Sequence, residues 1–94
     1  MKSRELLDKA LIKVGGPSEL ARQIRWNKGS IAGITKKDSK QKVPPYRAAQ
    51  LADLLGVDRV AAYLGALEEH AKTEHEKAFW REQIEERKKK LKFA

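Results

Sequence analysis

Residues 19–37 read ELARQIRWNKGSIAGITKK, and this stretch decides how the chain folds. Its apolar residues recur at helical spacing, first at Leu20 and Ile24 and again at Ile31 and Ile34. A basic, turn-like break separates the two groups. The pattern predicts two short helices joined by a tight turn. Such a pair is either an amphipathic hairpin that closes a small core or a surface that lies in a groove of DNA.

The remainder of the chain also has helical patterning, because its β-branched and aromatic residues never form a run of strand length. Apolar spacing, capping residues and Gly or Pro breaks predict six helices, over about 3–14, 17–24, 27–35, 45–55, from Asp58 through Leu67, and from Thr73 onward. We therefore expect an all-α fold. A five-helix domain would span residues 1–70, and a charged C-terminal helix with a fraying basic tail would span residues 71–94.

Local chemistry adds three expectations around these helices. Asn27 and Asp58 are good N-caps, because their side chains accept hydrogen bonds from otherwise unpaired backbone N–H groups. Trp26 is expected to pack in the core, and a contact with a partner or with DNA is the alternative. The segment KKDSKQKVPP, residues 36–45, is polar and aperiodic, so it is predicted to be an exposed loop.

The net charge is unevenly distributed along the 94 residues. Residues 1–43 carry eleven Lys and Arg against four Asp and Glu, a balance of +7, whereas residues 44–94 carry ten against nine, a balance of +1. Between Glu19 and Asp53 the only acid is Asp38. A one-sided basic field suits a polyanion, because neutralised phosphates release their condensed counterions. Charge alone leaves open that this surface is only well solvated.

The opening stretch meets the requirements of a helix-turn-helix unit, whose second helix enters the major groove of DNA. The two helices cross closely, so a small residue is needed early in the first, and Ala21 is in that place. The start of the second helix must be polar and rich in donors, and Asn27, Lys28 and Ser30 satisfy this.

Two segments together resemble the Cro/repressor (XRE-type) helix-turn-helix family. SELARQIRWNKGSIAGITK, residues 18–36, is similar to its helix-turn-helix, and VPPYRAAQLADLLGVD, residues 43–58, is similar to its fourth helix. The layout with an added charged helix is similar to small regulators of prophages and filamentous phages. The chain departs from the family at Arg25, where Gly is usual. Either Arg25 adopts a left-handed backbone conformation or the turn differs from that of the family. Gly29 and Gly33 weaken the second helix.

The resemblance implies a set of DNA contacts. Base edges would be contacted by Asn27, Lys28, Ser30 and Gly33, and phosphates by Ser18, Arg22, Thr35, Lys36, Lys37, Lys40 and Lys42.

The C-terminal helix carries an apolar stripe that includes Phe79, Trp80 and Ile84. This stripe must be buried against something. Two arrangements remain open: the helix folds back on its own domain, or it pairs with a second copy of the chain, since the family often binds two half-sites as a dimer.

These observations favour a cytoplasmic, dimeric transcriptional repressor of phage type that binds double-stranded operator DNA. Two alternatives remain: an interaction module, such as an antitoxin or phage accessory factor, acting through the C-terminal helix, and a binder of structured RNA. With no Cys, disulfide and thiol chemistry are excluded. His70 and His75 lack a third ligand at metal spacing. We expect no enzymatic activity, cofactor, metal, small-molecule substrate or membrane span.

Overall fold

The computed structural model describes residues 2–93, and within that range the chain forms six α-helices and no strand. The helices are α1 (Ser3–Val14), α2 (Pro17–Ile24), α3 (Lys28–Thr35), α4 (Pro45–Leu55), α5 (Arg59–His70) and α6 (Glu74–Phe93). The predicted all-α class is confirmed, and the helix boundaries match those expected from the apolar spacing and caps. α6 continues through the basic tail as far as Phe93.

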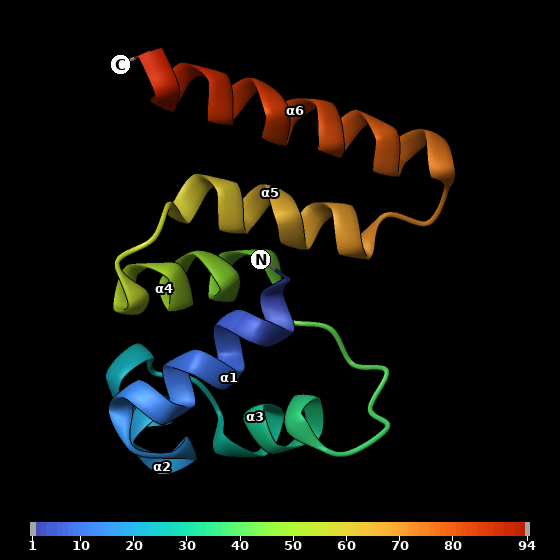
Figure 1. The fold of residues 1–94 in the computed structure, drawn as a ribbon. Helices are drawn as coiled ribbons and strands as arrows, with labels where there is room; N and C mark the ends of the chain where they lie inside the picture. The colour runs from blue at the N-terminus through green and yellow to red at the C-terminus, as the bar shows by residue number, and fades with distance from the viewer. Residues whose placement is uncertain (1, 94) are drawn as a thin grey trace.

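The helices are stacked so that the two ends of the molecule differ (Figure 1). α5 lies between α4 and α6, and α1 packs on α4 while also contacting α2 and α3. The short helices α2 and α3 therefore form one end of the molecule, and α6 forms the other. Of the two arrangements expected for the C-terminal helix, the single chain adopts the first, because α6 folds back along α5.

One apolar core joins the first five helices. Its fully buried members include Leu6 and Leu7 from α1, Leu20 from α2, Ile31 from α3 and Leu51 from α4. Ala62 and Ala66 extend the same core into α5, and Trp26 is buried in it as expected. The apolar positions that defined the helices by their spacing are thus the positions that hold them together.

The segment 36–44 is less exposed than its composition predicted. Val43 is buried with 1% of its surface accessible, so the expectation of an exposed loop is wrong there. Its carbonyl oxygen lies 3.0 Å from Nε2 of His70, at the end of α5. Proline at positions 44 and 45 keeps this stretch extended, which lets Val43 reach the core without belonging to a helix.

Four basic side chains bind carbonyl groups at the C-terminal ends of helices. Cations are favourable there, because the last carbonyls of a helix lack intrahelical partners and carry the negative end of the helix dipole. Arg47 donates to the Ile24 oxygen at the end of α2, and Arg4 donates to the Ile34 oxygen at the end of α3. Lys13 donates to the Leu54 oxygen of α4, and Lys42 donates to the Glu69 oxygen of α5. Part of the basic excess of residues 1–43 therefore has a structural role.

Candidate nucleic-acid interface

α3 is anchored by its apolar side and presents a polar side to solvent. Ile31 and Ile34 are 0% and 3% exposed, and they face α1 and α2 within the core. Lys28, Gly29 and Ser30 are exposed at the start of the helix. No acidic residue lies in α3, so this exposed face carries only neutral and positive groups.

Asn27 is the N-cap of α3, as its position predicted. Its Oδ1 accepts hydrogen bonds from the backbone N–H groups of Gly29 at 2.6 Å and of Ser30 at 3.2 Å. The side-chain oxygen is thus committed to the helix. Any contact of Asn27 with a base edge has to use its amide N–H groups, which are donors.

The turn between α2 and α3 contains a strained residue. Arg25 adopts the left-handed conformation with φ of 53°, which resolves the alternative left open by the sequence. The Arg25 and Trp26 N–H groups both donate to the Ala21 oxygen, so the turn closes α2 as a glycine would. The conformation costs an L-residue about 1 kcal/mol or more. Arg25 is exposed beside the start of α3.

Arg47 of α4 binds the backbone of this turn. Its guanidinium donates to the Ile24 oxygen at 2.8 Å and to the Arg25 oxygen at 3.2 Å. The same group lies 5.3 Å from the ring centre of Trp26 and 4.5 Å from that of Tyr46, both within cation–π range. Two carbonyls at the end of α2 and two aromatic rings thereby fix one guanidinium, which orients the turn that precedes α3.

Gly33, expected to face a base edge, lies under the following loop. A side chain at this position would come within 2.7 Å of the Gln41 Oε1 atom. Ser39 Oγ donates to the Gly33 oxygen at 2.6 Å and accepts from the Gln41 N–H at 3.1 Å. The close atom, Gln41 Oε1, is the end of an exposed, flexible side chain, so a larger residue at position 33 would require Gln41 to shift but not the loop backbone. The predicted base contact by Gly33 requires Gln41 to move aside.

Three of the predicted phosphate-binding lysines are exposed on one loop. Lys36, Lys37 and Lys40 surround a shallow hollow next to Gly33. The loop turns at Asp38, which has φ of 63°, a conformation that Asp tolerates better than most residues. The structure therefore places these three lysines around one hollow immediately after α3.

The other predicted phosphate contacts have partners of their own or lie apart. The Thr35 hydroxyl donates to the Ile31 oxygen at 3.0 Å, and Lys42 Nζ donates to the Glu69 oxygen at 2.7 Å. Arg22 forms an ion pair with Glu19. The hydrogen bond from Arg22, followed by that from Gln23, lowers the pKa of Glu19 to about 2. Ser18 is exposed at the other end of α2, near its N-terminus.

The predicted partner residues on α6 are divided between two environments. Phe79 is 51% exposed, and its ring lies edge-on to Trp80 with 5.0 Å between the ring centres. Trp80 and Ile84 are half-buried, and Ile84 lines a cavity beside α5. Phe79 is thus the member of this set that is most available to a second molecule.

No family model, curated protein or solved structure matches this chain. The function of the α3 surface therefore has to be inferred from its own residues. Among residues 2–93, no cluster of His, Asp and Glu could hold a metal ion. In the same range, none of the helices combines the length and apolar character that a membrane span requires.

Sequence reasoning missed the residues that position α3. Arg4 donates to the Ile34 oxygen at 2.7 Å and to the Thr35 oxygen at 3.0 Å, and so holds the end of α3. Arg47 holds the end of α2 in the same way. Their partners are more than twenty residues away in sequence, so no local pattern reveals them.

Proposed function

We propose that the protein binds double-stranded DNA through α3 and the loop that follows it, and regulates transcription by occupying an operator. The observation that carries this proposal is the exposed face of α3. It is free of acid and has Arg25 and Lys28 at one end and the Lys36–Lys40 loop at the other. In a helix-turn-helix protein such a face enters the major groove.

The turn geometry supports a helix-turn-helix of the Cro/repressor type. The left-handed conformation that glycine usually adopts in the turn of this family is adopted by Arg25. Arg47 holds the turn before α3 and Arg4 holds the C-terminal end of α3, which reduces the freedom that a helix containing Gly29 and Gly33 would otherwise have. A fixed helix loses less entropy when it binds DNA.

The proposed DNA contacts are of two kinds, those to base edges and those to phosphates. Lys28 and Ser30, at the exposed start of α3, are proposed to contact base edges, together with the amide of Asn27. Lys36, Lys37 and Lys40 are proposed to contact phosphates, which hold the protein on the duplex without reading its sequence. Affinity thus depends more on the loop, and specificity more on the first turn of α3.

Footprinting on the DNA that flanks the gene, over a range of salt concentrations, tests the proposal. A protected site with dyad symmetry supports an operator. Lys28→Ala should relax base preference, whereas Lys36→Ala should weaken binding to all sequences alike and reduce the salt slope by about one. Salt-sensitive binding without any protected site would refute sequence-specific regulation.

A homodimer and a protein-interaction module both remain proposals, and Phe79 is the observation in favour of each. An aromatic ring that is half exposed beside Trp80 is a suitable anchor for a second molecule. Sedimentation equilibrium of the wild type and of Phe79→Glu tests the dimer. A wild-type dimer that Phe79→Glu converts to monomer supports it, and identical behaviour of the two refutes this contact. A chain ending at residue 72 that keeps DNA affinity but loses function would favour the interaction module.

A further inference from the structure

Arg25 has a backbone conformation that this chain gives to glycine at its other left-handed helix ends. Within residues 2–93, α1, α2 and α4 end in a left-handed C-cap, at Gly15, Arg25 and Gly56, with φ of 92°, 53° and 72°. Glycine adopts this conformation without steric strain, whereas a residue with a Cβ atom is strained by it. Of these three caps, Arg25 is the one at which the chain keeps a side chain although it lowers stability.

The Arg25 side chain does not offset this strain by binding its own chain. In the described part of the chain, the hydrogen bonds of Arg25 involve its backbone: its N–H donates to the Ala21 oxygen, and its oxygen accepts from Arg47. A cation can stabilise a helix C-terminus by binding the last carbonyls, but Arg47 already binds those of Ile24 and Arg25. The exposed Arg25 side chain therefore has no structural role in the folded chain.

The charge of Arg25 is also not neutralised by an ion pair among the described residues. The closest acid along the chain is Glu19, and its carboxylate accepts from Arg22 and Gln23. α3 begins at Lys28 and contains no acid. Arg25 and Lys28 thus present two exposed positive charges at the same end of α3.

We propose that Arg25 contacts a phosphate of the DNA duplex, at the edge of the groove that α3 enters. This inference rests on the proposed DNA interface and adds a residue to it. Arg25 precedes α3 and its N-cap, so it is expected at the edge of the groove, whereas Lys28 and Ser30 lie on the helix itself. A guanidinium suits a phosphate because it is always charged and donates two parallel hydrogen bonds to phosphate oxygens.

The proposal predicts that removing the side chain changes stability and DNA affinity in opposite directions. Arg25→Gly relieves the strain and should raise the melting temperature by about 2–8 °C. One phosphate contact contributes about 0.9 to the slope of log affinity against log salt, so the same variant should bind a random-sequence duplex of about 30 base pairs roughly five- to ten-fold more weakly near 0.1 M salt. Fluorescence anisotropy over a range of salt concentrations measures both quantities.

Two further variants separate the charge from the backbone. Arg25→Gln removes the charge but keeps the strained side chain, so it should lose the same affinity as Arg25→Gly without the gain in stability. Arg25→Lys keeps the charge and should retain the wild-type salt slope. A role of the turn in positioning α3 predicts the opposite, because Arg25→Gly preserves the left-handed turn and would then bind DNA normally.

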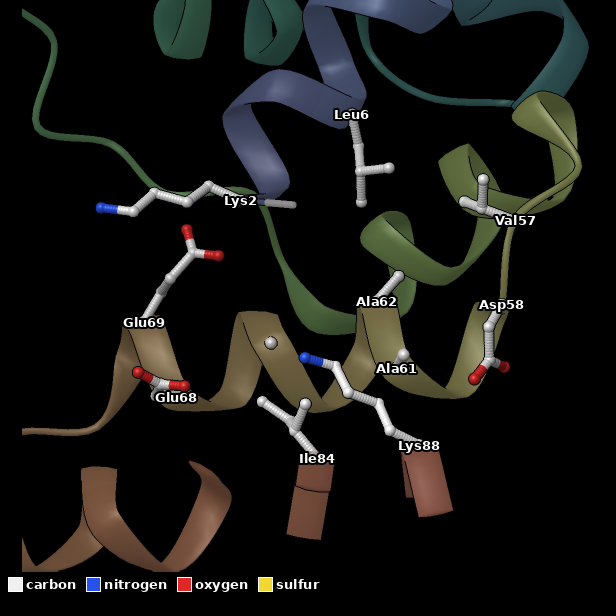
Figure 2. A pocket seen from close by; sticks show the side chains of 11 residues that line it. Lys2, Leu6, Val57, Asp58, Ala61, Ala62, Glu68, Glu69, Ile84 and Lys88 are labelled. Atoms are coloured by element: carbon white, nitrogen blue, oxygen red, sulfur yellow. The ribbon is translucent and has the colours of Figure 1, made fainter. Parts of the chain in front are cut away.

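Lys88→Gln is the control for losing one positive charge elsewhere on the protein. Lys88 is 65% exposed on α6, and Figure 2 shows α5 between it and α1. This variant should keep the wild-type salt slope, because a charge far from the duplex is screened. If Arg25→Gly binds DNA as the wild type does, or loses no more affinity than Lys88→Gln, the Arg25 contact is refuted and the proposed function stands.

The remaining outcomes distinguish the two proposals. A loss confined to the operator found by footprinting, with the random duplex unaffected, would assign Arg25 to a base and overturn the phosphate contact. Failure of the wild-type protein to bind either duplex would refute the proposed DNA interface, and the Arg25 contact with it.

Discussion

Lys36 and Lys42 are two lysines of one loop to which the structure gives different roles. The sequence assigns both to phosphates. In the structure Lys36 is exposed beside the Lys37 and Lys40 side chains, whereas Lys42 Nζ donates to the Glu69 oxygen at 2.7 Å. Replacing either by Ala removes one positive charge and the same side chain. The two variants therefore form a matched pair whose effects should fall on different properties.

For Lys42→Ala we expect a loss of stability with little effect on DNA. A cation at a helix C-terminus contributes about 0.3–1 kcal/mol, and a charged hydrogen bond contributes about 1.5–3 kcal/mol when shielded from water. Lys42 is exposed, so about 1 kcal/mol is reasonable for the sum. In a domain of this size that lowers the melting temperature by about 4–8 °C.

For Lys36→Ala the expectation is reversed. The melting temperature should change by less than about 2–4 °C, because a surface change away from special contacts alters stability by at most about 0.5 kcal/mol. The slope of log affinity against log salt should become less steep by about 0.9, the value for one phosphate contact. Thermal unfolding and salt-dependent fluorescence anisotropy measure the two properties. If Lys42→Ala reduces the slope as much as Lys36→Ala and leaves the melting temperature unchanged, the structural role of Lys42 is refuted.

Three further predictions concern the turn and the α6 junction. Arg25→Gly should raise the free energy of unfolding in urea by about 0.5–1 kcal/mol by relieving the left-handed strain, and Arg25→Ala, which keeps the strain, should not. Arg47→Met should lower it by about 1.5–3 kcal/mol because two carbonyls lose a charged donor, and a loss under about 0.5 kcal/mol would contradict this. Asp58→Asn keeps the helix cap but breaks the pair with Arg87, at a cost of about 0.5–1 kcal/mol at pH 7. Because the folded pKa of Asp58 is lowered from 3.8, that difference should be complete above pH 3.8 and disappear as the pH falls through the lowered value; a difference independent of pH would exclude the ion pair.

Periodicity and capping chemistry were sufficient to predict the helices. Asn27 and Asp58 cap the helices expected of them, since a cap involves only neighbours within one turn. Leu20 and Ile31 are buried as their spacing required. The same reasoning failed at Val43, because its burial depends on the extended path of a loop and on contact with α5. Local rules describe helices well and the course of a loop poorly.

The candidate site was only partly predictable, for the same reason. Exposed cations such as Lys28, Lys36 and Lys37 were identified from charge and position. Whether a lysine is free or bound to a carbonyl depends on what the fold brings near it, as Lys42 illustrates with a partner 27 residues away. The loop over Gly33 could not be anticipated either, because glycine in a short helix has several explanations.

The cations at the helix ends change what the basic half of the chain implies. A balance of +7 over residues 1–43 suggests a broad positive surface. Arg4, Lys13 and Lys42 bind helix carbonyls and Arg22 binds Glu19, so four of those charges are already partly neutralised. The cations that remain near α3 are Arg25 and Lys28 at its start and Lys36, Lys37 and Lys40 after its end. A small number of phosphate contacts concentrated on one helix gives a modest salt slope, so discrimination between DNA sequences would have to come from the first turn of α3.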